Sequence, residues 1–256
     1  MKTLKLLLII LFFPLLACAD EQPWKVFKST HFLVYYQNAK EPVLNEVALK
    51  AEDCYNKITD DLGFRRFDFW TWDNRAKIYL FDNQQNYMQE TNEPEWSAGQ
   101  AQINSKLIQT FITAQGFLDS VLPHELGHII FREMVGFNNP AIPLWLDEGV
   151  ACYQQEENSF VKEDLANKIN QGNFIRFNDL NNFSSLGLQS TDTVILFYTQ
   201  SYSLVKFLIA EFGKDKFVLF CQDLRDRREL TRALRLVYGF NNLDDFESAW
   251  KKYILK

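Results

Sequence analysis

The chain has 256 residues, a formal net charge of −6 at pH 7, and aromatic residues at 15% of the total. This length is enough for a hydrophobic core and for one or two compact units. The composition is that of an ordinary globular protein, and the acidic balance argues against a nucleic-acid partner, because such a partner selects a basic protein surface.

Residues 1–19 have the pattern of an export signal. Lys2 and Lys5 form its positive part, and the apolar run 6–16 is shorter than the about 20 residues that a membrane span needs. Two outcomes stay open at its end. The sequence A-C-A at 17–19 is a cleavage site for simple release, whereas L-L-A-C, ending at Cys18, resembles a bacterial lipobox in which Cys18 is lipidated. Both outcomes predict an exported, periplasmic or extracellular protein, and the second anchors it to a membrane.

Cysteine usage gives no sign of a disulfide framework. Beyond the signal, three cysteines remain, at Cys54, Cys152 and Cys221. An odd number cannot all pair within one chain. Their wide spacing contains no Cys-x-x-Cys, so a thiolate metal site is not predicted either.

The first half of the chain is predicted to contain strands and helices. Runs rich in Val, Phe and Tyr favour strands, and apolar residues at helical spacing favour helices. The predicted elements are, in order, two strands within 24–37, a helix over 42–61 that Gly63 ends, a strand over 76–81, and a short helix over 84–90 that Pro94 breaks. His31 lies in the first of these stretches, and we assign it no function.

The stretch 97–112 predicts two strands joined at Asn104-Ser105. A sheet edge beside an active-site helix can pair with an extended peptide through main-chain hydrogen bonds. The residues that we expect to bind substrate in this way are Gly99, Gln100, Ala101 and Gln102. An ordinary hairpin without a binding role is the alternative.

A His-Glu-x-x-His pentad follows at 124–128. In a helix, His124 and His128 stand one turn apart on the same face and can bind one zinc ion from one side. Glu125 lies next to the first ligand and is placed to act on a zinc-bound water. The alternative is an amphipathic helix with partly buried histidines, but two of the chain's only three histidines fall in this pentad.

The rest of the chain is predicted to be helical. The predicted helices are the pentad helix from a cap at Asp119 or Ser120 to Gly136, one from Leu144, one over 160–169 capped by Asn158-Ser159, a long apolar one over 193–212, and three more over 214–224, 229–238 and 243–254. The Asn-rich stretch 172–182 is predicted to be a loop.

The helix from Leu144 carries Glu148, and His, His and Glu form a known catalytic zinc set with one open position. We therefore expect one zinc per chain. The expected fold class is α+β, with a mixed sheet and the active-site helix in about 24–136 and a mainly helical part in about 137–256. A single functional domain would then span 20–256.

The motif set resembles the gluzincin metallopeptidases. Glu148 follows the pentad after nineteen residues, inside W-L-D-E-G-V-A, and the run from Tyr198 matches as well. The similarity is greatest to peptidase MA-like domain proteins and more distant to the zinc aminopeptidases. It implies zinc-dependent hydrolysis of peptide or protein substrates with Glu125 as general base. It also implies that Tyr198 stabilises the oxyanion. Tyr202, one turn further, is the alternative, and core packing is the alternative for both.

Two positions depart from these families. Zinc aminopeptidases hold the substrate's amino terminus with the Glu of G-x-M-E-N, whereas this chain has G-Q-A-Q-I at 99–103, with neutral Gln102. A free ammonium would lose its charge-assisted partner, so we expect an endopeptidase. Thermolysin-like enzymes orient a histidine ligand with an Asp four residues after the Glu ligand. That position is Cys152 here, so the orienting group must come from elsewhere.

Two other functions remain open. The domain could be a zinc-binding or structural module without turnover, or a zinc hydrolase that acts on a substrate other than a peptide. The presence of Glu125 argues against the first, because a purely structural metal needs no general base.

Overall fold

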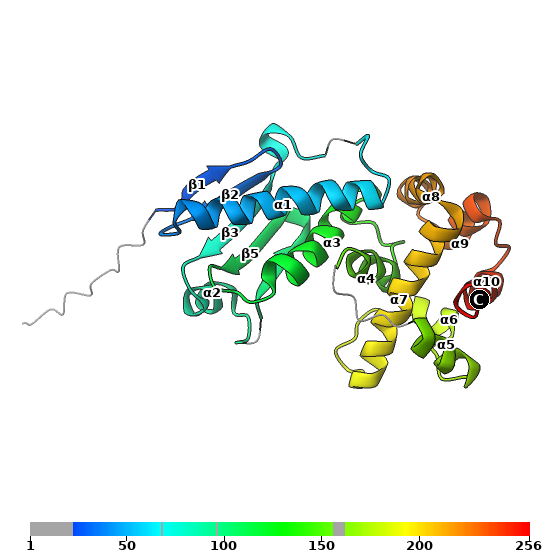
Figure 1. Ribbon diagram of the computed structural model, residues 1–256. Coiled ribbons are helices and arrows are strands. Elements are labelled where there is room, and N and C mark those ends of the chain that lie inside the picture. The colour runs from blue at the N-terminus through cyan, green and yellow to red at the C-terminus, as the bar shows by residue number, and fades with distance from the viewer. Residues whose placement is uncertain (1–22, 68, 96, 156–161) are drawn as a thin grey trace, which may run out of the picture.

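The computed structural model describes residues 23–67, 69–95, 97–155 and 162–256. The export signal with Cys18 and the predicted cap at 158–159 therefore lie outside the described residues. The described chain has the predicted α+β architecture, with a mixed sheet followed by a mainly helical part (Figure 1).

The sheet has the order β1-β2-β3-β5-β4 in the described residues. Its strands are β1 Lys25–Lys28, β2 Phe32–Tyr36, β3 Ala76–Phe81, β4 Gly99–Gln102 and β5 Leu107–Phe111. β2, β3 and β5 run parallel, while β1 and β4 pair antiparallel with β2 and β5. The predicted strand pairs at 24–37 and 97–112 are thus confirmed, and β4 lies at an edge of the sheet.

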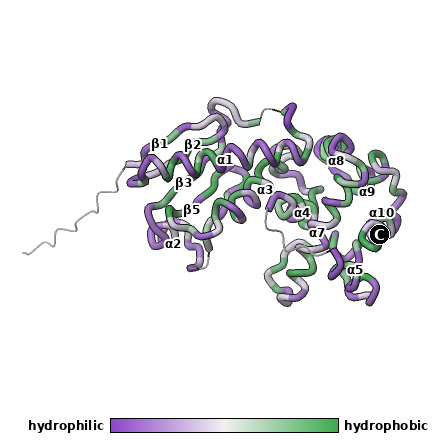
Figure 2. Tube along the Cα trace, viewed as in Figure 1, coloured by the Kyte–Doolittle hydropathy of each residue, from purple (hydrophilic) through white to green (hydrophobic). Residues whose placement is uncertain are grey.

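Helices α1 (Glu41–Asp61) and α3 (Leu122–Val135) cover one face of the sheet, and the shorter α2 (Gln84–Thr91) covers part of the other. Alternation along the strands explains the two faces, since successive side chains point to opposite sides. Val34 and Ile78 are fully buried under the long helices, whereas Tyr35 and Tyr79 stack on the opposite face with ring centroids 4.6 Å apart. Figure 2 shows the hydrophobic stretches on the inner strands and along α3.

The helical part contains α4 to α10, with α7 as its longest element. The bounds are α4 Leu144–Tyr153, α5 Lys162–Asn170, α6 Phe177–Asn181, α7 Thr191–Phe212, α8 Lys214–Arg227, α9 Leu230–Ala233 and α10 Leu243–Ile254. A π-helical turn, Leu234–Tyr238, continues α9. By length and composition α7 could cross a membrane, but half of its most apolar window is buried inside the protein, and it packs along α4. These features are those of a core helix.

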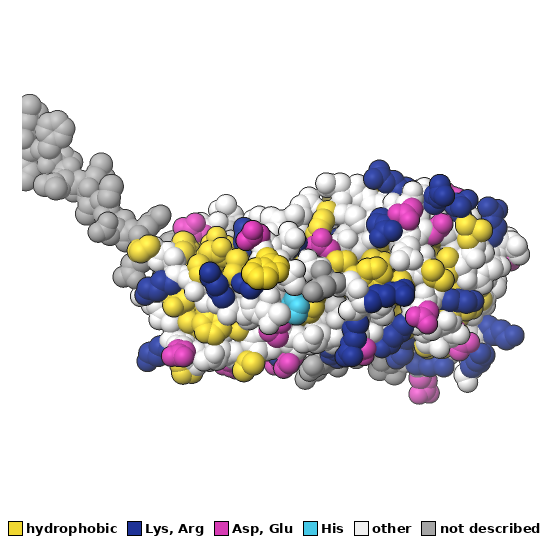
Figure 3. Space-filling model, turned by 90° about the horizontal axis from the view of Figure 1, so that it is seen from above, with side chains coloured by type: hydrophobic (Ala, Val, Ile, Leu, Met, Phe, Trp, Pro, Cys, Tyr) yellow, Lys and Arg dark blue, Asp and Glu magenta, His cyan; other side chains and the backbone are white. Residues whose placement is uncertain are grey.

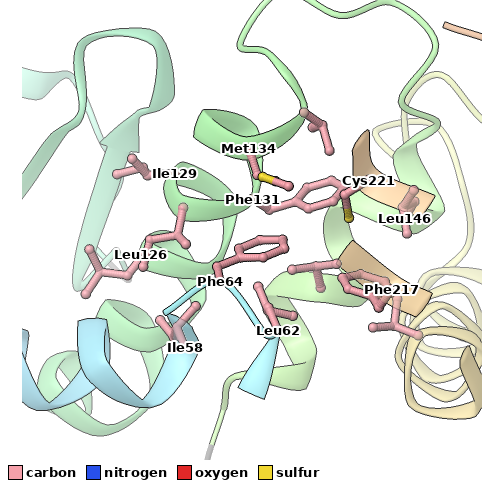
Figure 4. Close-up of a cluster of buried hydrophobic side chains, with 14 of the residues drawn as sticks. Ile58, Leu62, Phe64, Leu126, Ile129, Phe131, Met134, Leu146, Phe217 and Cys221 are labelled. Atoms are coloured by element: carbon pink, nitrogen blue, oxygen red, sulfur yellow. The ribbon is translucent and has the colours of Figure 1, made fainter. Parts of the chain in front are cut away.

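A continuous core joins the sheet to the helical part. Figure 4 shows Phe64, Phe131 and Phe217 in one cluster with aliphatic side chains of α1, α3 and α4. Phe64 and Phe217 stack with ring centroids 6.4 Å apart. Helix α3 is therefore anchored from both sides, which fixes the element that carries the pentad.

Charged side chains of both signs are interspersed on the surface. Seen from above, they crowd the helical end, while hydrophobic side chains are frequent at the sheet end (Figure 3). A mixed surface of this kind keeps a protein soluble. The net charge of −6 is therefore not gathered into one acidic patch on this face.

Two predictions about local structure were wrong. Neither Asp119 nor Ser120 caps α3, because a π-helical turn, Phe117–Val121, leads directly into the helix. Its hydrogen bonds to the Gly116 oxygen already use the backbone N–H groups of Ser120 and Val121. The Asn-rich stretch predicted as a loop also contains the short helix α6. Its Phe177 and Leu180 are buried, so tertiary packing overrides the weak helix propensity of Asn.

Candidate metal centre

His124 and His128 leave α3 one turn apart. The opposite side of the helix carries Leu122, Leu126 and Ile129, which are completely buried. This anchoring directs both imidazoles to the same place, with His124 Nε2 lying 3.2 Å from His128 Nε2. The two rings are nearly perpendicular, at an interplanar angle of 84°.

Glu148 reaches the histidines because α4 packs closely on both α3 and α7. A Cβ atom added at Gly127 of α3 would lie 2.9 Å from Ala151 Cα, and one added at Gly149 of α4 would lie 2.5 Å from the backbone oxygen of Ser201. Glycine inside a helix is unfavourable by about 1 kcal/mol relative to alanine. Close approach of the three helices explains why glycine stands at both positions.

The three candidate ligand atoms are spaced as the ligands of one ion would be. Glu148 Oε2 lies 3.7 Å from His124 Nε2 and 3.5 Å from His128 Nε2. Two atoms that are each about 2.1 Å from a tetrahedral zinc ion are about 3.4 Å apart. Glu148 Oε2 is also buried without a hydrogen-bond partner among the described residues, as expected of an oxygen whose partner is a cation. The donor set therefore fits a metal ion.

The charges of the two histidines differ because their neighbours differ. Burial lowers the pKa of His124 to about 4, and His128 adds to this effect, so the neutral imidazole offers its lone pair to a metal. Burial would also lower the pKa of His128, but Asp147 and Glu148 outweigh it and raise the pKa to about 10. His128 therefore carries a positive charge when no metal is bound, and a metal ion at this place would have to displace a ring proton.

Glu125 is half-buried beside the ligands. Burial raises its pKa, and the nearby carboxylates of Glu148 and Glu93 raise it further, against the opposing effect of His128. A carboxylate is most effective as a general base when its pKa lies near the working pH. The surroundings of Glu125 raise its pKa from the ordinary carboxyl value towards neutral pH.

Helix α7 gives Tyr198 and Tyr202 different surroundings. Burial raises the pKa of Tyr198 to about 12, so its hydroxyl keeps its proton. The site residues that add to this rise are, in order, Glu148, Cys152 and Glu125. Tyr202 instead contacts Tyr153, with ring centroids 6.1 Å apart, and its hydroxyl accepts a hydrogen bond from Lys206 Nζ at 3.4 Å. The groups that act on Tyr198 are thus those of the metal centre.

Comparison with known families is consistent with this geometry. The sequence profile of the Peptidase MA superfamily matches residues 56–256, which include β3, the pentad helix and the whole helical part. The chain belongs to the Peptidase MA superfamily. Members of this superfamily have a metallopeptidase-like domain and are generally metal-dependent. The search of curated proteins found no match to the chain.

In this Peptidase MA domain, the predicted substrate-binding residues form β4, which contacts α3. Ala101 packs against the core on the side of α3, so alternation turns Gln100 and Gln102 to the other face of the sheet. There both amide groups donate to Gln109 Oε1, at 3.2 and 3.4 Å. Gln102 is therefore neutral, and it turns away from the face of the sheet that α3 covers.

Sequence reasoning missed the carboxylate that faces His128. Asp147 Oδ1 lies 3.2 Å from His128 Nδ1, and Arg132 Nη2 donates to Asp147 Oδ2 at 2.7 Å. Cys152, which occupies the position used by thermolysin-like enzymes, is a buried thiol whose pKa burial and Glu148 raise to about 12. A signal was available in the sequence, because Arg132 follows His128 by one helical turn and Asp147 directly precedes Glu148.

Proposed function

We propose that the chain is a zinc-dependent peptidase that holds one zinc ion through His124, His128 and Glu148. The observation that supports this most is the convergence of two imidazole nitrogens and an otherwise unpartnered carboxylate oxygen within 4.8 Å of one another. When bound, a zinc ion acts as a Lewis acid that acidifies water and polarises a peptide carbonyl. Two nitrogen ligands and one oxygen ligand leave a fourth position open for this chemistry.

Glu125 is the proposed general base. It adjoins His124 in the chain, and its raised pKa suits a group that takes a proton from the attacking water and returns it to the leaving amine. Burial strengthens its interaction with charges that develop nearby.

Tyr198 is the proposed oxyanion donor. Its hydroxyl stays protonated far above neutral pH, so it can donate a hydrogen bond to the oxygen on which negative charge develops. The influence of Glu148 and Glu125 on Tyr198 supports this choice over Tyr202, whose hydroxyl is engaged by Lys206.

The free edge of β4 is the proposed peptide-binding strand. Within the described residues its main chain pairs with β5 on one side only, and an extended substrate could add on the other side. Because Gln102 is neutral and its amide donates to Gln109, β4 lacks the carboxylate that would hold a free amino terminus. These features favour an endopeptidase.

The test is turnover of a mixed peptide library, half of it N-acetylated, by residues 20–256 with and without a zinc chelator. We expect internal cleavage of acetylated peptides that the chelator abolishes. Glu125→Gln should keep its zinc and lose about a hundred- to ten-thousand-fold in rate, while the double variant His124→Ala, His128→Ala should lose the zinc. Zinc binding without cleavage of any peptide would contradict a peptidase and favour a module without turnover.

A further inference from the structure

A zinc-binding histidine must present one particular ring nitrogen. Only a nitrogen without a proton can bind the ion, and the hydrogen bond made by the other nitrogen selects which one that is. His128 Nε2 faces His124 and Glu148, while His128 Nδ1 lies 3.2 Å from Asp147 Oδ1. A proton held on Nδ1 by the carboxylate leaves the Nε2 lone pair directed at the metal position.

Both oxygens of the Asp147 carboxylate are engaged. Oδ1 faces His128, and Oδ2 accepts from Arg132 Nε at 3.0 Å and from Arg132 Nη2 at 2.7 Å. Asp147 and His128 are 7% and 6% exposed, so water competes little for these bonds. A buried charge-assisted pair of this kind holds its geometry well.

The Arg132 guanidinium is itself tied to the helical part. Its Nη1 donates to the backbone oxygen of Asn139 at 3.3 Å, and the Asn139 amide donates to Val135 O and Leu224 O at 2.9 and 3.0 Å. Leu224 belongs to α8. A chain of hydrogen bonds therefore leads from His128 on α3 to Asp147 on α4 and back to Arg132 on α3. From Arg132 it continues through Asn139 to α8.

From these contacts we infer that Asp147 is the positioning residue of the metal centre, which fixes the tautomer and the ring direction of His128, and that Arg132 holds Asp147 in place. This inference rests on the proposed zinc site. Asp147, the residue immediately before Glu148, takes the orienting role that Cys152 cannot take. His124 has no such support, because its buried Nδ1 has no hydrogen-bond partner among the described residues.

The chemistry of the pair explains why an aspartate is required. An asparagine has one acceptor oxygen and one NH₂ group in the place of two acceptors. Arg132 and the His128 Nδ1–H are both donors, so one of them would face the NH₂ group. Either Arg132 would lose its acceptor, or His128 would take the wrong tautomer and turn its protonated Nε2 towards the metal.

The experiment measures the zinc dissociation constant of residues 20–256 by competition with a chromophoric chelator. Asp147→Asn should weaken zinc binding about ten- to a hundred-fold, the usual effect of losing a group that orients a metal ligand. Arg132→Lys should weaken zinc binding less than Asp147→Asn does, because the ammonium keeps a positive charge beside Asp147. It should still weaken binding, because one ammonium cannot hold Asp147 and the Asn139 oxygen at once. The absorption bands of the cobalt-substituted protein should shift in both variants, which a loss of global stability alone would not cause.

Glu133→Gln is the matched control. Glu133 is the neighbour of Arg132 on α3. Its carboxylate is half-buried and, like that of Asp147, is paired, with Lys106 Nζ at 3.2 Å and with Trp70 Nε1 at 3.2 Å. Its loss should lower the melting temperature and leave the zinc dissociation constant unchanged. A role of Asp147 that is merely structural would make the two variants alike.

The outcomes are separable. A folded Asp147→Asn protein that binds zinc within about threefold of the parent, well below the usual loss, with unchanged cobalt bands, would overturn the inference. If Asp147→Asn does not fold, Arg132→Lys decides in the same way. A parent chain that binds no zinc would refute the proposed metal site itself. Because the assay measures zinc affinity and not cleavage, a failure of the proposed peptidase activity would leave this inference untouched.

Discussion

Gly149→Ala tests the close packing that brings Glu148 to the histidines. The new Cβ atom would lie 2.5 Å from Ser201 O, 2.8 Å from Ser201 C and 2.9 Å from Val205 Cγ2. An ordinary contact begins at 3.4 Å, so α4 and α7 would have to separate by about 0.9 Å. Because the atoms in the way are mainly backbone, no rotamer change can absorb the overlap.

The cost can be worked out from opposing terms. Overpacking a core costs about 1–3 kcal/mol, and the backbone contact places this case at the upper end. Replacing a helical glycine with alanine returns about 1 kcal/mol. The net loss of about 2 kcal/mol should lower the melting temperature by about 4–8 °C for a chain of this size. A shift of about 1 Å between Glu148 and Tyr198 should also reduce turnover about a hundred-fold.

Thermal unfolding followed by circular dichroism and single-turnover kinetics measure both effects. Gly187→Ala is the control, because Gly187 has an unstrained backbone and its added Cβ would meet only Ser185 Oγ, at 3.7 Å. That variant should keep the parental melting temperature and rate. If Gly149→Ala also keeps both, α4 and α7 do not pack as closely as described, and the account of how Glu148 is placed is wrong.

The remaining predictions concern the oxyanion donor, acid stability and export. Tyr198→Phe should lower the single-turnover rate about a hundred- to a thousand-fold at unchanged zinc content, because it removes one hydrogen-bond donor. Tyr202→Phe is the control. A drop in rate in Tyr202→Phe alone would make Tyr202 the oxyanion donor. Burial would raise the pKa of Glu52, but hydrogen bonds from His31 and Ser29 outweigh it and lower the pKa below 4.5, so the folded state gains stability above that pH and loses it as the pH falls through the lowered value. Glu52→Gln should therefore show a weaker pH dependence of urea unfolding below pH 5, and identical profiles for the two proteins would contradict this. If Cys18 is lipidated, the parent expressed in bacteria should partition into detergent and Cys18→Ala should be soluble; equal solubility would favour simple signal cleavage.

Much of the fold could be predicted from local sequence patterns. Val34 and Ile78 are buried and alternate with less buried neighbours along their strands, and this period of two is set by the backbone alone. Gly136 marks the end of the pentad helix as predicted, because a positive φ is a local property. The π-helical turn before α3 was not predictable in the same way, since it depends on how the helix enters the core.

In the candidate site, too, local patterns were predictable and contacts between elements were not. The pentad and Glu148 could be identified because metal ligands need particular residue types at particular spacings. Arg132 and Asp147 lie next to the candidate ligands in the sequence, but their contact joins two helices, and no helical period relates residues on different helices. The direction of Gln102 was accessible in principle, because a strand that turns Ala101 to the core must turn Gln102 away from it.

The shared hydrogen bonds of Asp147 with His128 and Arg132 also bear on how this protein's relatives vary. A residue that depends on a partner for its charge balance cannot change alone without leaving a buried charge unpaired. Substitutions at Asp147 and Arg132 should therefore be correlated across related sequences. Relatives with H-E-x-x-H-x-x-x-R should carry D-E-G at the third ligand, the glutamate. Those with an acidic residue four positions after that glutamate should lack the Arg–Asp pair. The two arrangements would represent alternative evolutionary solutions to directing the same imidazole.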